Sequence, residues 1–291
     1  MIQQAIEKAS VLIEALPYIQ RFREDLVVVK VCGSIMDDEQ GLQNILKDLA
    51  FMECVGLRPV LVHGGGKSIS AAMTSQGLKP HFLNGMRVTD ADTIRVVEQV
   101  LNHEVNTHLC DILSGFETKA VPVHGQDIIR CQRHTETDEE TGDVLDWGFV
   151  GDITSVDVSS LRTAVSENAV PVITPLGSDA DGQVYNINAD VAAAAVARHL
   201  KARKLVFLTD VPGLMHDPED KETLISTLKQ AEVDRLIERG IIAGGMLPKV
   251  RSAIDAIQAG VKKTHIIDAA MPHSLLLELF TDKGIGTEIV A

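Results

Sequence analysis

Two glycine-containing turns directly follow runs of apolar residues that are typical of buried strands. The turns span 30–34 (KVCGS) and 63–68 (HGGGKS), and the second one opens a helical segment. Glycine at such a junction lets backbone amides approach a ligand, and a helix N-terminus adds about half a positive charge. We therefore expect a phosphate or carboxylate site here. The alternative is a plain tight turn at 64–66, which is disfavoured because consecutive glycines cost backbone entropy.

The glycine turns do not match the standard nucleotide or hydrolase motifs. A Walker A loop would place glycine where Leu61 stands, and a dinucleotide fingerprint starting at Gly64 would need glycine at Ile69. The HGGG string resembles an esterase oxyanion hole, but no G-x-S-x-G elbow occurs in the chain. The anion site must therefore belong to another class.

Four more polar residues stand near the ends of expected elements. Arg87 (in NGMRVT) precedes a helix, while Asn186 and Asp190 (in NINAD) lead into another. An Asp at a helix start is most often a cap. Lys249 (in GGMLPK) follows Pro248, which suits the first helical position. A lysine there opposes the helix dipole, so it either lies on a solvated surface or meets a bound anion, and both remain open.

Strands and helices alternate along most of the chain, which favours an α/β fold with an open, mainly parallel central sheet sandwiched by helices. Ligands in such folds bind at the carboxyl ends of the strands. We expect strands at 26–31, 59–63, 120–123, 170–174, 204–209 and 264–268. We expect helices at 40–54, 67–76, 90–113 (capped by Thr89), 190–200, 230–238, 249–259 and 273–280. Polar strands at 128–135 and 144–150 flank an acidic turn, 136–143, and predict a hairpin.

The N-terminal segment predicts a short amphipathic helix. Apolar residues recur every three or four positions from Ile2 to Leu16, and Pro17 should kink or stop the helix. Such a helix cannot bury its apolar stripe alone. It packs either on its own domain or on another subunit, and the pattern does not decide between them.

The chain is acidic: 27 Lys and Arg stand against 41 Asp and Glu, for a formal charge of −14 over 291 residues. This balance argues against a nucleic-acid binder and against docking on an anionic membrane. The negative charge also sets a paradox, because the glycine turns look like anion-binding sites and yet the chain as a whole is anionic. The length suggests one large domain or two fused lobes.

The four cysteines (Cys32, Cys54, Cys110 and Cys131) lie far apart, without zinc-site spacing. We see neither an apolar run of the ~18 residues that a transmembrane helix needs nor a signal-peptide core within 1–24. We therefore expect reduced thiols in a cytoplasmic protein, with no metal held by protein ligands.

Six strings in this order resemble the amino-acid kinase superfamily, and within it the N-acetylglutamate kinases of arginine biosynthesis. The resemblance runs from residue 26 to residue 287, and only the combination is specific. The strings are VHGGGKSI, NGMRVTD, DWGFVGDI, NINAD, LTDVPGL and GGMLPKV.

The resemblance implies an ATP- and Mg²⁺-dependent kinase that phosphorylates the side-chain carboxylate of N-acetyl-L-glutamate. Lys30 and Lys249 match the lysines that stabilise the transferring phosphoryl group, and Asp190 matches the aspartate that orients them. Four positions match the acceptor site, with Arg87 clamping a carboxylate: Gly65, Gly66, Arg87 and Asn186. Six match the nucleotide site: Gly33, Thr209, Asp210, Val211, Gly213 and Leu214. We also expect four cations from distant segments to converge on one site: Lys30, Lys67, Arg87 and Lys249.

One position departs from the family pattern. The family usually has two glycines after the first lysine, and here Cys32 takes the place of the first. If that backbone needs a positive φ, Cys32 would be strained by roughly 1–2 kcal/mol. It could also crowd the phosphates. Either effect would lower activity without removing it.

The resemblance also gives the N-terminal helix a role. Arginine-inhibited family members carry a kinked N-terminal helix that interlaces dimers into a hexamer. Tyr18, His265, Glu278 and Gly284 match positions that line their arginine site. The alternative is that His265 caps a strand and Glu278 faces solvent. A nitrogen-signalling regulatory protein is a possible further partner.

The resemblance divides the chain into three parts: an oligomerisation helix at 1–24, an acceptor-binding and dimerisation lobe at 25–195, and a nucleotide-binding lobe at 196–291. Two other functions stay open. One is a kinase for another acidic acceptor, such as glutamate, aspartate or an aminoadipate derivative. The other is a non-catalytic arginine-binding homologue.

Overall fold

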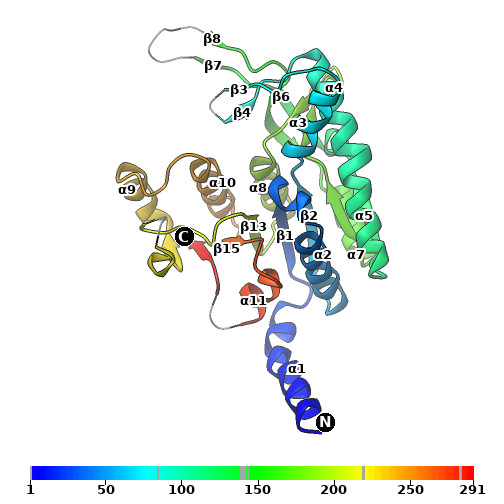
Figure 1. The fold of residues 1–291 in the computed structure, drawn as a ribbon, viewed down its shortest axis with the longest axis vertical. Helices are drawn as coiled ribbons and strands as arrows, with labels where there is room; N and C mark the ends of the chain where they lie inside the picture. The colour runs from blue at the N-terminus through cyan, green and yellow to red at the C-terminus, as the bar shows by residue number, and fades with distance from the viewer. Residues whose placement is uncertain (1, 84, 138–141, 143, 218–219, 282–283) are drawn as a thin grey trace.

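An eight-stranded sheet forms the centre of the computed structural model. Figure 1 shows its strands β1, β2, β13 and β15 in the middle of the molecule. The structure describes residues 2–83, 85–137, 142, 144–217, 220–281 and 284–291. The strand order is β14-β16-β15-β13-β1-β2-β10-β5, and within it only β15 and β16 pair antiparallel. The expected open, mainly parallel sheet is confirmed. Its strands are β1 Leu26–Val31, β2 Arg58–His63, β5 Ala120–Val123, β10 Val170–Ile173, β13 Lys204–Thr209, β14 Thr227–Lys229, β15 Lys263–Asp268 and β16 Thr287–Val290.

Helices cover both faces of this sheet because its central strands are apolar on both sides. In β1, Val28 belongs to one buried cluster, whereas Val27, Val29 and Val31 belong to the other. The first face is covered by α7 Ser159–Ser166, α8 Ala189–Leu200 and α10 Met246–Gln258. The second is covered by α2 Glu39–Cys54, α5 Asn106–Gly115 and α11 Ser274–Phe280.

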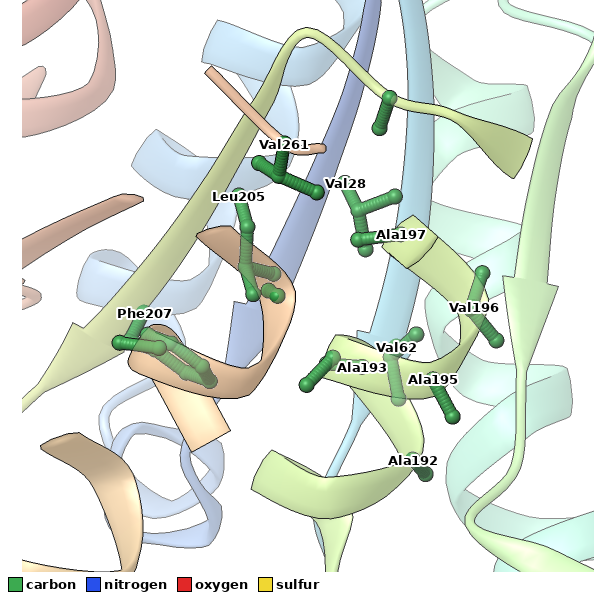
Figure 2. Packing of buried hydrophobic residues seen from close by; sticks show 14 of the residues in the cluster. Val28, Val62, Ala192, Ala193, Ala195, Val196, Ala197, Leu205, Phe207 and Val261 are labelled. Atoms are coloured by element: carbon green, nitrogen blue, oxygen red, sulfur yellow. The ribbon is translucent and has the colours of Figure 1, made fainter. Parts of the chain in front are cut away.

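Helix α8 lies close to the sheet because small residues line it. Figure 2 shows Ala192, Ala193 and Ala195 of α8 beside Val62 of β2, in the cluster that also holds Phe207 of β13. Small side chains let a helix backbone approach a strand while the valines fill the layer between them. This contact places Asp190, in the first turn of α8, near the carboxyl ends of the strands.

The expected helix 90–113 is one continuous helical run with a change of type inside it. It consists of α4 Ala91–Gln99, a π-helical turn Val100–Val105 and α5. Its N-cap is Asp90, whose carboxylate accepts a hydrogen bond from the Thr93 amide, so the expected cap at Thr89 was wrong. The Thr89 hydroxyl is engaged elsewhere, because it donates to the Arg87 carbonyl oxygen and accepts from the Asn186 side-chain amide.

The hairpin at 128–150 exists with different strand ends. β6 Ile129–Arg133 pairs with β9 Gly151–Val156, and β7 Glu136–Thr137 pairs with β8 Val144–Leu145. The expected second strand at 144–150 was therefore wrong in its extent. Most of the acidic turn at 136–143 lies outside the described residues. β6 and β9 join a second sheet with β11 Leu176–Ser178 and β12 Val184–Asn186. A short hairpin, β3 Phe82–Leu83 and β4 Met86–Arg87, projects beside it.

Helix α1 Ile2–Phe22 continues through Pro17, so the proline does not stop it. It extends away from the rest of the chain in Figure 1, and only its C-terminal end packs, with Phe22 buried. Ile2 and Ile13 are 79% and 67% exposed. Of the two alternatives for the apolar stripe, packing on its own domain was therefore wrong.

The remaining elements follow the sequence with small shifts. The expected helix 230–238 is a 3₁₀ turn, Gln230–Glu232, followed by α9 Val233–Glu238. α10 begins at Met246, so Pro248 lies at its third rather than its first position. The short helical elements are 3₁₀ turns Gly33–Asp37 and Lys221–Thr223, α3 Gly66–Ser75 and α6 Gly125–Ile128. No described helix is long and apolar enough to cross a membrane.

Candidate active site

Three buried charges meet where β1 and two helix N-terminal segments converge. Lys30 Nζ lies 2.7 Å from Asp190 Oδ1, and Lys249 Nζ donates a hydrogen bond to Asp190 Oδ2 at 2.8 Å. All three residues are less than a tenth exposed. Lys249 is thus not on a solvated surface, and Asp190 is not the cap of α8, because Asn188 caps that helix.

This cluster carries a net positive charge. Burial alone would raise the pKa of the Asp190 carboxyl, but the charges of Lys30 and Lys249 outweigh it and hold the pKa below its ordinary value. The carboxylate therefore stays ionised and holds both ammonium groups in fixed positions. One positive charge is left without a buried partner in the cluster, which suits an incoming anion.

The two glycine turns pack directly against each other. A Cβ added to Gly33 would lie 3.1 Å from the Gly66 amide nitrogen and 3.5 Å from that of Gly65. Such a close approach favours glycine at position 33. Gly65 and Gly66 are the N-cap and first residue of α3, and no side chain caps this helix. First-turn amides have no partner inside a helix, so these N–H groups are available to an anion.

Beside the glycine turns lies a cavity of about 180 Å³. It brings together all four residues that were expected to bind the acceptor: Gly65, Gly66, Arg87 and Asn186. Gly64, of the glycine turn that the sequence singled out, also lines it. The other wall residues were not assigned to this site from the sequence. They are Ile69, Phe82, Gly85, Met86, Leu101, Val150, Pro175, Ile187, Asn188 and Ala189.

Arg87 is a buried cation at the wall of this cavity, 7% exposed. Its Nη2 donates to the Gly66 carbonyl and the Ser70 hydroxyl, each at 2.8 Å, and its guanidinium lies 4.7 Å from the centre of the Phe82 ring. No carboxylate of the described chain forms an ion pair with it. Burial lowers the pKa of Arg87, but a guanidinium stays protonated in proteins.

The hairpin that carries Arg87 is anchored by Trp147, the one tryptophan of the chain. In the sequence this residue stood out only as part of the string DWGFVGDI. Trp147 is fully buried, and its indole N–H donates to the Leu83 carbonyl at 3.2 Å. The Trp147 carbonyl accepts from the Thr89 amide, and the Asn186 side-chain amide donates to the Thr89 hydroxyl at 3.3 Å. These bonds link β3–β4 to β12 and so fix two walls of the cavity.

The residues expected to bind nucleotide follow β13, the strand next to β1. Thr209 ends β13, and its hydroxyl donates to the Asp210 carboxylate at 3.2 Å. Leu214 is part of the core, and its amide donates to the Thr287 hydroxyl of β16. Gly213 lies where a Cβ would meet that same hydroxyl at 2.6 Å. Val211 lies between Asp210 and Gly213 on the same loop.

Lys67 does not join the buried cluster as expected. Its side chain is exposed and forms an ion pair with Asp37 at 2.8 Å. The pKa of Lys67 is raised mainly by its hydrogen bond to Asp37. Lys67 therefore lies on the surface beside the glycine turn and outside the buried cluster.

Cys32 adopts φ −73° and ψ 153°, an extended conformation open to every residue. The expected backbone strain was therefore wrong, because this position does not need the left-handed region. Its thiol lies 3.0 Å from the Ser34 hydroxyl.

Replacing Cys32 with glycine is expected to change kcat by less than about threefold, because no strain is relieved. Glycine gains conformational freedom in the unfolded chain, so the free energy of unfolding should fall by about 0.5–1 kcal/mol. Steady-state kinetics and urea unfolding measure the two effects. A tenfold gain in kcat for Cys32→Gly would show instead that the thiol crowds the phosphates.

A second, larger cavity of about 610 Å³ lies between the end of α1 and residues of the C-terminal part of the chain. It brings together Tyr18, His265, Glu278 and Gly284, the four residues that the resemblance placed at an arginine site. His265 and Glu278 are both buried, and His265 Nδ1 lies 2.6 Å from Glu278 Oε1. The alternative of a strand cap and a solvent-facing carboxylate was therefore wrong.

The charges in this second cavity are of both signs. Burial raises the pKa of Glu278, but the hydrogen bond from His265 and the Ile285 and Gly286 amides outweighs it and holds the pKa low. Burial lowers the pKa of Lys204 to about 8. Its ammonium lies 4.4 Å from the centre of the Phe22 ring of α1.

The chain resembles proteins of one family over nearly its whole length. The model of the amino acid kinase family matches residues 25–268. An acetylglutamate kinase from Symbiobacterium thermophilum is 46% identical, with all of both chains covered.

Two solved structures of N-acetylglutamate synthase from Neisseria gonorrhoeae share the fold. One, with coenzyme A and N-acetyl-glutamate, is 30% identical with a TM-score of 0.85 over 97% of this chain and 63% of the synthase. The other, with coenzyme A and L-arginine, is 28% identical with a TM-score of 0.79 over 95% of this chain and 64% of the synthase. This chain thus spans less than two thirds of the synthase. The full-length identity and the family match show that the chain belongs to the amino acid kinase family, among its acetylglutamate kinases.

Proposed function

We propose that the chain transfers the γ-phosphoryl group of ATP to the side-chain carboxylate of N-acetyl-L-glutamate, in arginine biosynthesis. The observation that carries the proposal is the buried Lys30–Asp190–Lys249 cluster beside the two glycine turns. A net positive, preorganised cluster stabilises the charge that gathers on a phosphoryl group in transfer.

The acceptor would lie in the 180 Å³ cavity with its α-carboxylate on Arg87. The guanidinium is buried, and no described side chain neutralises it. A carboxylate ligand would supply the missing charge and accept two parallel N–H bonds. Apolar walls such as Ile69 and Leu101 suit the methylene and acetyl groups of the acceptor.

The reaction needs no general base. The acceptor's side-chain carboxylate is ionised at neutral pH, with a pKa of about 4. One of its oxygens forms a bond to the γ-phosphorus, while the bond from that phosphorus to the bridging β–γ oxygen breaks and ADP leaves. Lys30 and Lys249 neutralise the negative charge on the transferring group, and the Gly65 and Gly66 amides donate to its oxygens.

ATP would bind along the loop from Thr209 to Leu214, with its phosphates reaching Gly33. Mg²⁺ would be coordinated mainly by the phosphate oxygens of ATP and would neutralise part of their negative charge. The residues present fit that arrangement, because Asp190 is already engaged by two ammonium groups and leaves the cation to the phosphates. The lobe at 25–195 would bind the acceptor, and the lobe at 196–291 would bind the nucleotide.

An assay of ATP turnover with N-acetyl-L-glutamate tests this function directly. Acyl phosphates are trapped as hydroxamates, and glutamate, aspartate and N-acetyl-aminoadipate are compared at equal concentration. Turnover that is largest with N-acetyl-L-glutamate supports the proposal. Larger turnover with another acceptor would overturn the specificity. Calorimetry that shows arginine binding without ATP binding would identify a non-catalytic homologue.

We further propose that L-arginine inhibits the enzyme from the 610 Å³ cavity. Glu278 and Glu288 offer carboxylates to a guanidinium, and Lys204 and Arg203 offer cations to an α-carboxylate. A side chain at Gly284 would lie 3.0 Å from the Glu278 carboxylate, so glycine keeps the approach open. The arginine-bound synthase of the same fold supports this assignment.

Replacing Glu278 with glutamine is expected to raise the arginine concentration for half-inhibition about 10–100-fold. The substitution removes one charge-assisted hydrogen bond, which is worth about 1.5–3 kcal/mol. Inhibition is measured relative to each variant's own uninhibited rate. Glu238→Gln, an exposed change in α9 of the same lobe, is the control. Equal inhibition curves for Glu278→Gln and Glu238→Gln would refute the arginine site.

The exposed apolar stripe of α1 suits association with another copy of the chain. We propose that it interlaces dimers into a hexamer, a trimer of dimers, in the cytoplasm. Tyr18 and Phe22 of the same helix border the arginine cavity, so oligomerisation and inhibition would be coupled. Sedimentation with and without residues 1–24 tests the assembly. A nitrogen-signalling protein remains a proposed partner.

A further inference from the structure

His63, the residue just before the three glycines, is fully buried and linked to two other segments. Its Nδ1 lies 2.8 Å from the Gly64 carbonyl oxygen, and its Nε2 lies 3.1 Å from the side-chain amide nitrogen of Asn106 in α5. The same Asn106 nitrogen donates to the Val172 carbonyl of β10 at 2.8 Å. A chain of hydrogen bonds therefore runs from β10 through Asn106 and His63 to the glycine turn.

These contacts fix the protonation of His63. The Gly64 carbonyl can only accept, so Nδ1 must carry the hydrogen. Nε2 must then accept from Asn106, whose nitrogen is identified because a flipped amide would set its oxygen against the Val172 carbonyl. Burial also lowers the pKa of His63 to about 4, although the bond to Gly64 opposes this. His63 is therefore the neutral Nδ1–H tautomer at working pH.

The π-helical turn Val100–Val105 brings Asn106 to this position. The Asn106 amide donates to the Leu101 carbonyl, five residues earlier, so Leu101 and Asn106 lie one π turn apart on the same side of the helix. Leu101 contacts the glycine turn, because a Cβ on Gly65 would lie 2.5 Å from its Cδ2. In a regular α-helix, residues five apart differ by about 140° around the axis and would not both face the turn.

Fixing the Gly64 carbonyl also fixes the next amide. Carbonyl and N–H point in opposite directions across a trans peptide, so a Gly64 oxygen held by His63 directs the Gly65 N–H away from His63. The nitrogens of Gly65 and Gly66 lie on the side that faces Gly33, where the two glycine turns meet. Among the described residues, no backbone amide outside the helices and strands donates to the Gly64 carbonyl, so His63 is what holds it.

We propose that Asn106 and His63 are positioning residues, which set the Gly64 peptide so that the Gly65 and Gly66 amides point at the transferring phosphoryl group. The π turn is the element that supplies Asn106 to this relay. The proposal rests on the proposed kinase function, since the amides matter only if a phosphoryl group passes between the turns. It assigns no proton transfer to His63.

Asn106→Leu tests the relay because leucine has as many side-chain heavy atoms in the same branched arrangement and cannot donate to His63. The matched control is Asn102→Leu, in the same π turn, where the side chain is equally buried and its oxygen has no hydrogen-bond partner among the described residues. We expect Asn106→Leu to lower kcat about 10–100-fold, as for a misplacement of up to 1 Å, with KM for ATP changed less than about threefold. Asn102→Leu should keep kcat within about threefold, even if both variants melt earlier.

His63→Asn and His63→Leu form the second pair. Asparagine places an amide nitrogen near the position of Nδ1 and can still donate to Gly64, whereas leucine cannot. His63→Asn should therefore retain at least about tenfold more kcat than His63→Leu. Solid-state NMR of the full-length protein, labelled with ¹⁵N-histidine, should assign His63 as the Nδ1–H tautomer, identified by the signal lost in His63→Asn.

The outcomes separate the relay from the kinase function. An Nε2–H tautomer at His63, or equal kcat for Asn106→Leu and Asn102→Leu, would overturn the relay while leaving the kinase function intact. An absence of N-acetylglutamate turnover in the unmodified protein would refute the function, and the NMR tautomer would still test the hydrogen-bond geometry. A selective loss of kcat in Asn106→Leu together with the Nδ1–H signal supports the proposal.

Discussion

Replacing Lys249 with methionine is expected to lower kcat about 10²–10³-fold, with KM for both substrates changed far less. Methionine keeps most of the side-chain volume but removes the ammonium that Asp190 holds at 2.8 Å. A preorganised charge acts mainly where new negative charge develops in transfer, so its loss appears in kcat. Steady-state kinetics with varied ATP and N-acetyl-L-glutamate measure the split.

The same substitution should not destabilise the protein, and this separates a catalytic from a structural role. Without Lys249, the Lys30–Asp190 pair is a neutral buried pair. Asp190→Asn instead leaves two buried ammonium groups side by side, which is strongly destabilising, by about 3–5 kcal/mol. Thermal unfolding should therefore show an unchanged or higher Tm for Lys249→Met and a clearly lower Tm for Asp190→Asn.

Lys47→Met, an exposed change on α2, is the control and should keep both kcat and Tm. If Lys249→Met retained kcat within threefold of the unmodified enzyme, Lys249 would have no role in transfer. If Lys249→Met and Asp190→Asn lowered Tm equally, the cluster would be a structural ion-pair network rather than a catalytic one.

The sequence predicted the sheet well because its central strands leave little choice. A run such as LVVVKV at 26–31 is apolar on both faces, and only a strand in the middle of a parallel sheet buries both. The helices between these strands follow from the same alternation. The neighbouring strands β14 and β16, at one end of the sheet, were missed because they are short segments whose pairing depends on distant partners.

Tertiary contacts decided the details that the sequence could not. Thr89 is a good cap by type, yet its backbone pairs with Trp147 and Phe149, so Asp90 caps the helix instead. The π turn inside 90–113 leaves no mark in the apolar pattern, because it replaces one regular period by a slightly longer one. Leu101 was therefore unrecognised as a wall of the 180 Å³ cavity.

The family resemblance assigned to one site residues that their spacing in the sequence would not have connected. Lys30, Asp190 and Lys249 are far apart in sequence, and the structure brings them to one place through parallel strands that end at the same edge. This also settles the paradox of an acidic chain with anion-binding motifs. The cations that matter are buried at that edge, and exposed Lys67 pairs with Asp37 instead. Net charge describes the surface rather than the site.

Replacing Arg87 with methionine is expected to raise KM for N-acetyl-L-glutamate about 10²-fold, while KM for ATP stays within about threefold. The guanidinium is 7% exposed and would form a desolvated, bidentate pair with the acceptor's α-carboxylate. Truncating one partner of such a pair costs about 2–5 kcal/mol. Arg87→Lys keeps the charge but not the planar fork, so its KM should fall between those of the unmodified enzyme and Arg87→Met.

Ligand-induced stabilisation gives an independent measurement of the same contact. A ligand present at about 100 times its Kd stabilises the folded state by about 2.7 kcal/mol, so N-acetyl-L-glutamate should raise the Tm of the unmodified enzyme. At the same concentration the shift should nearly vanish in Arg87→Met. Without ligand, Arg87→Met should melt no earlier than the unmodified chain, because the lost hydrogen bonds to Gly66 and Ser70 are offset by removal of a buried charge that has no carboxylate partner. A full Tm shift with N-acetyl-L-glutamate in Arg87→Met would place the carboxylate elsewhere in the cavity.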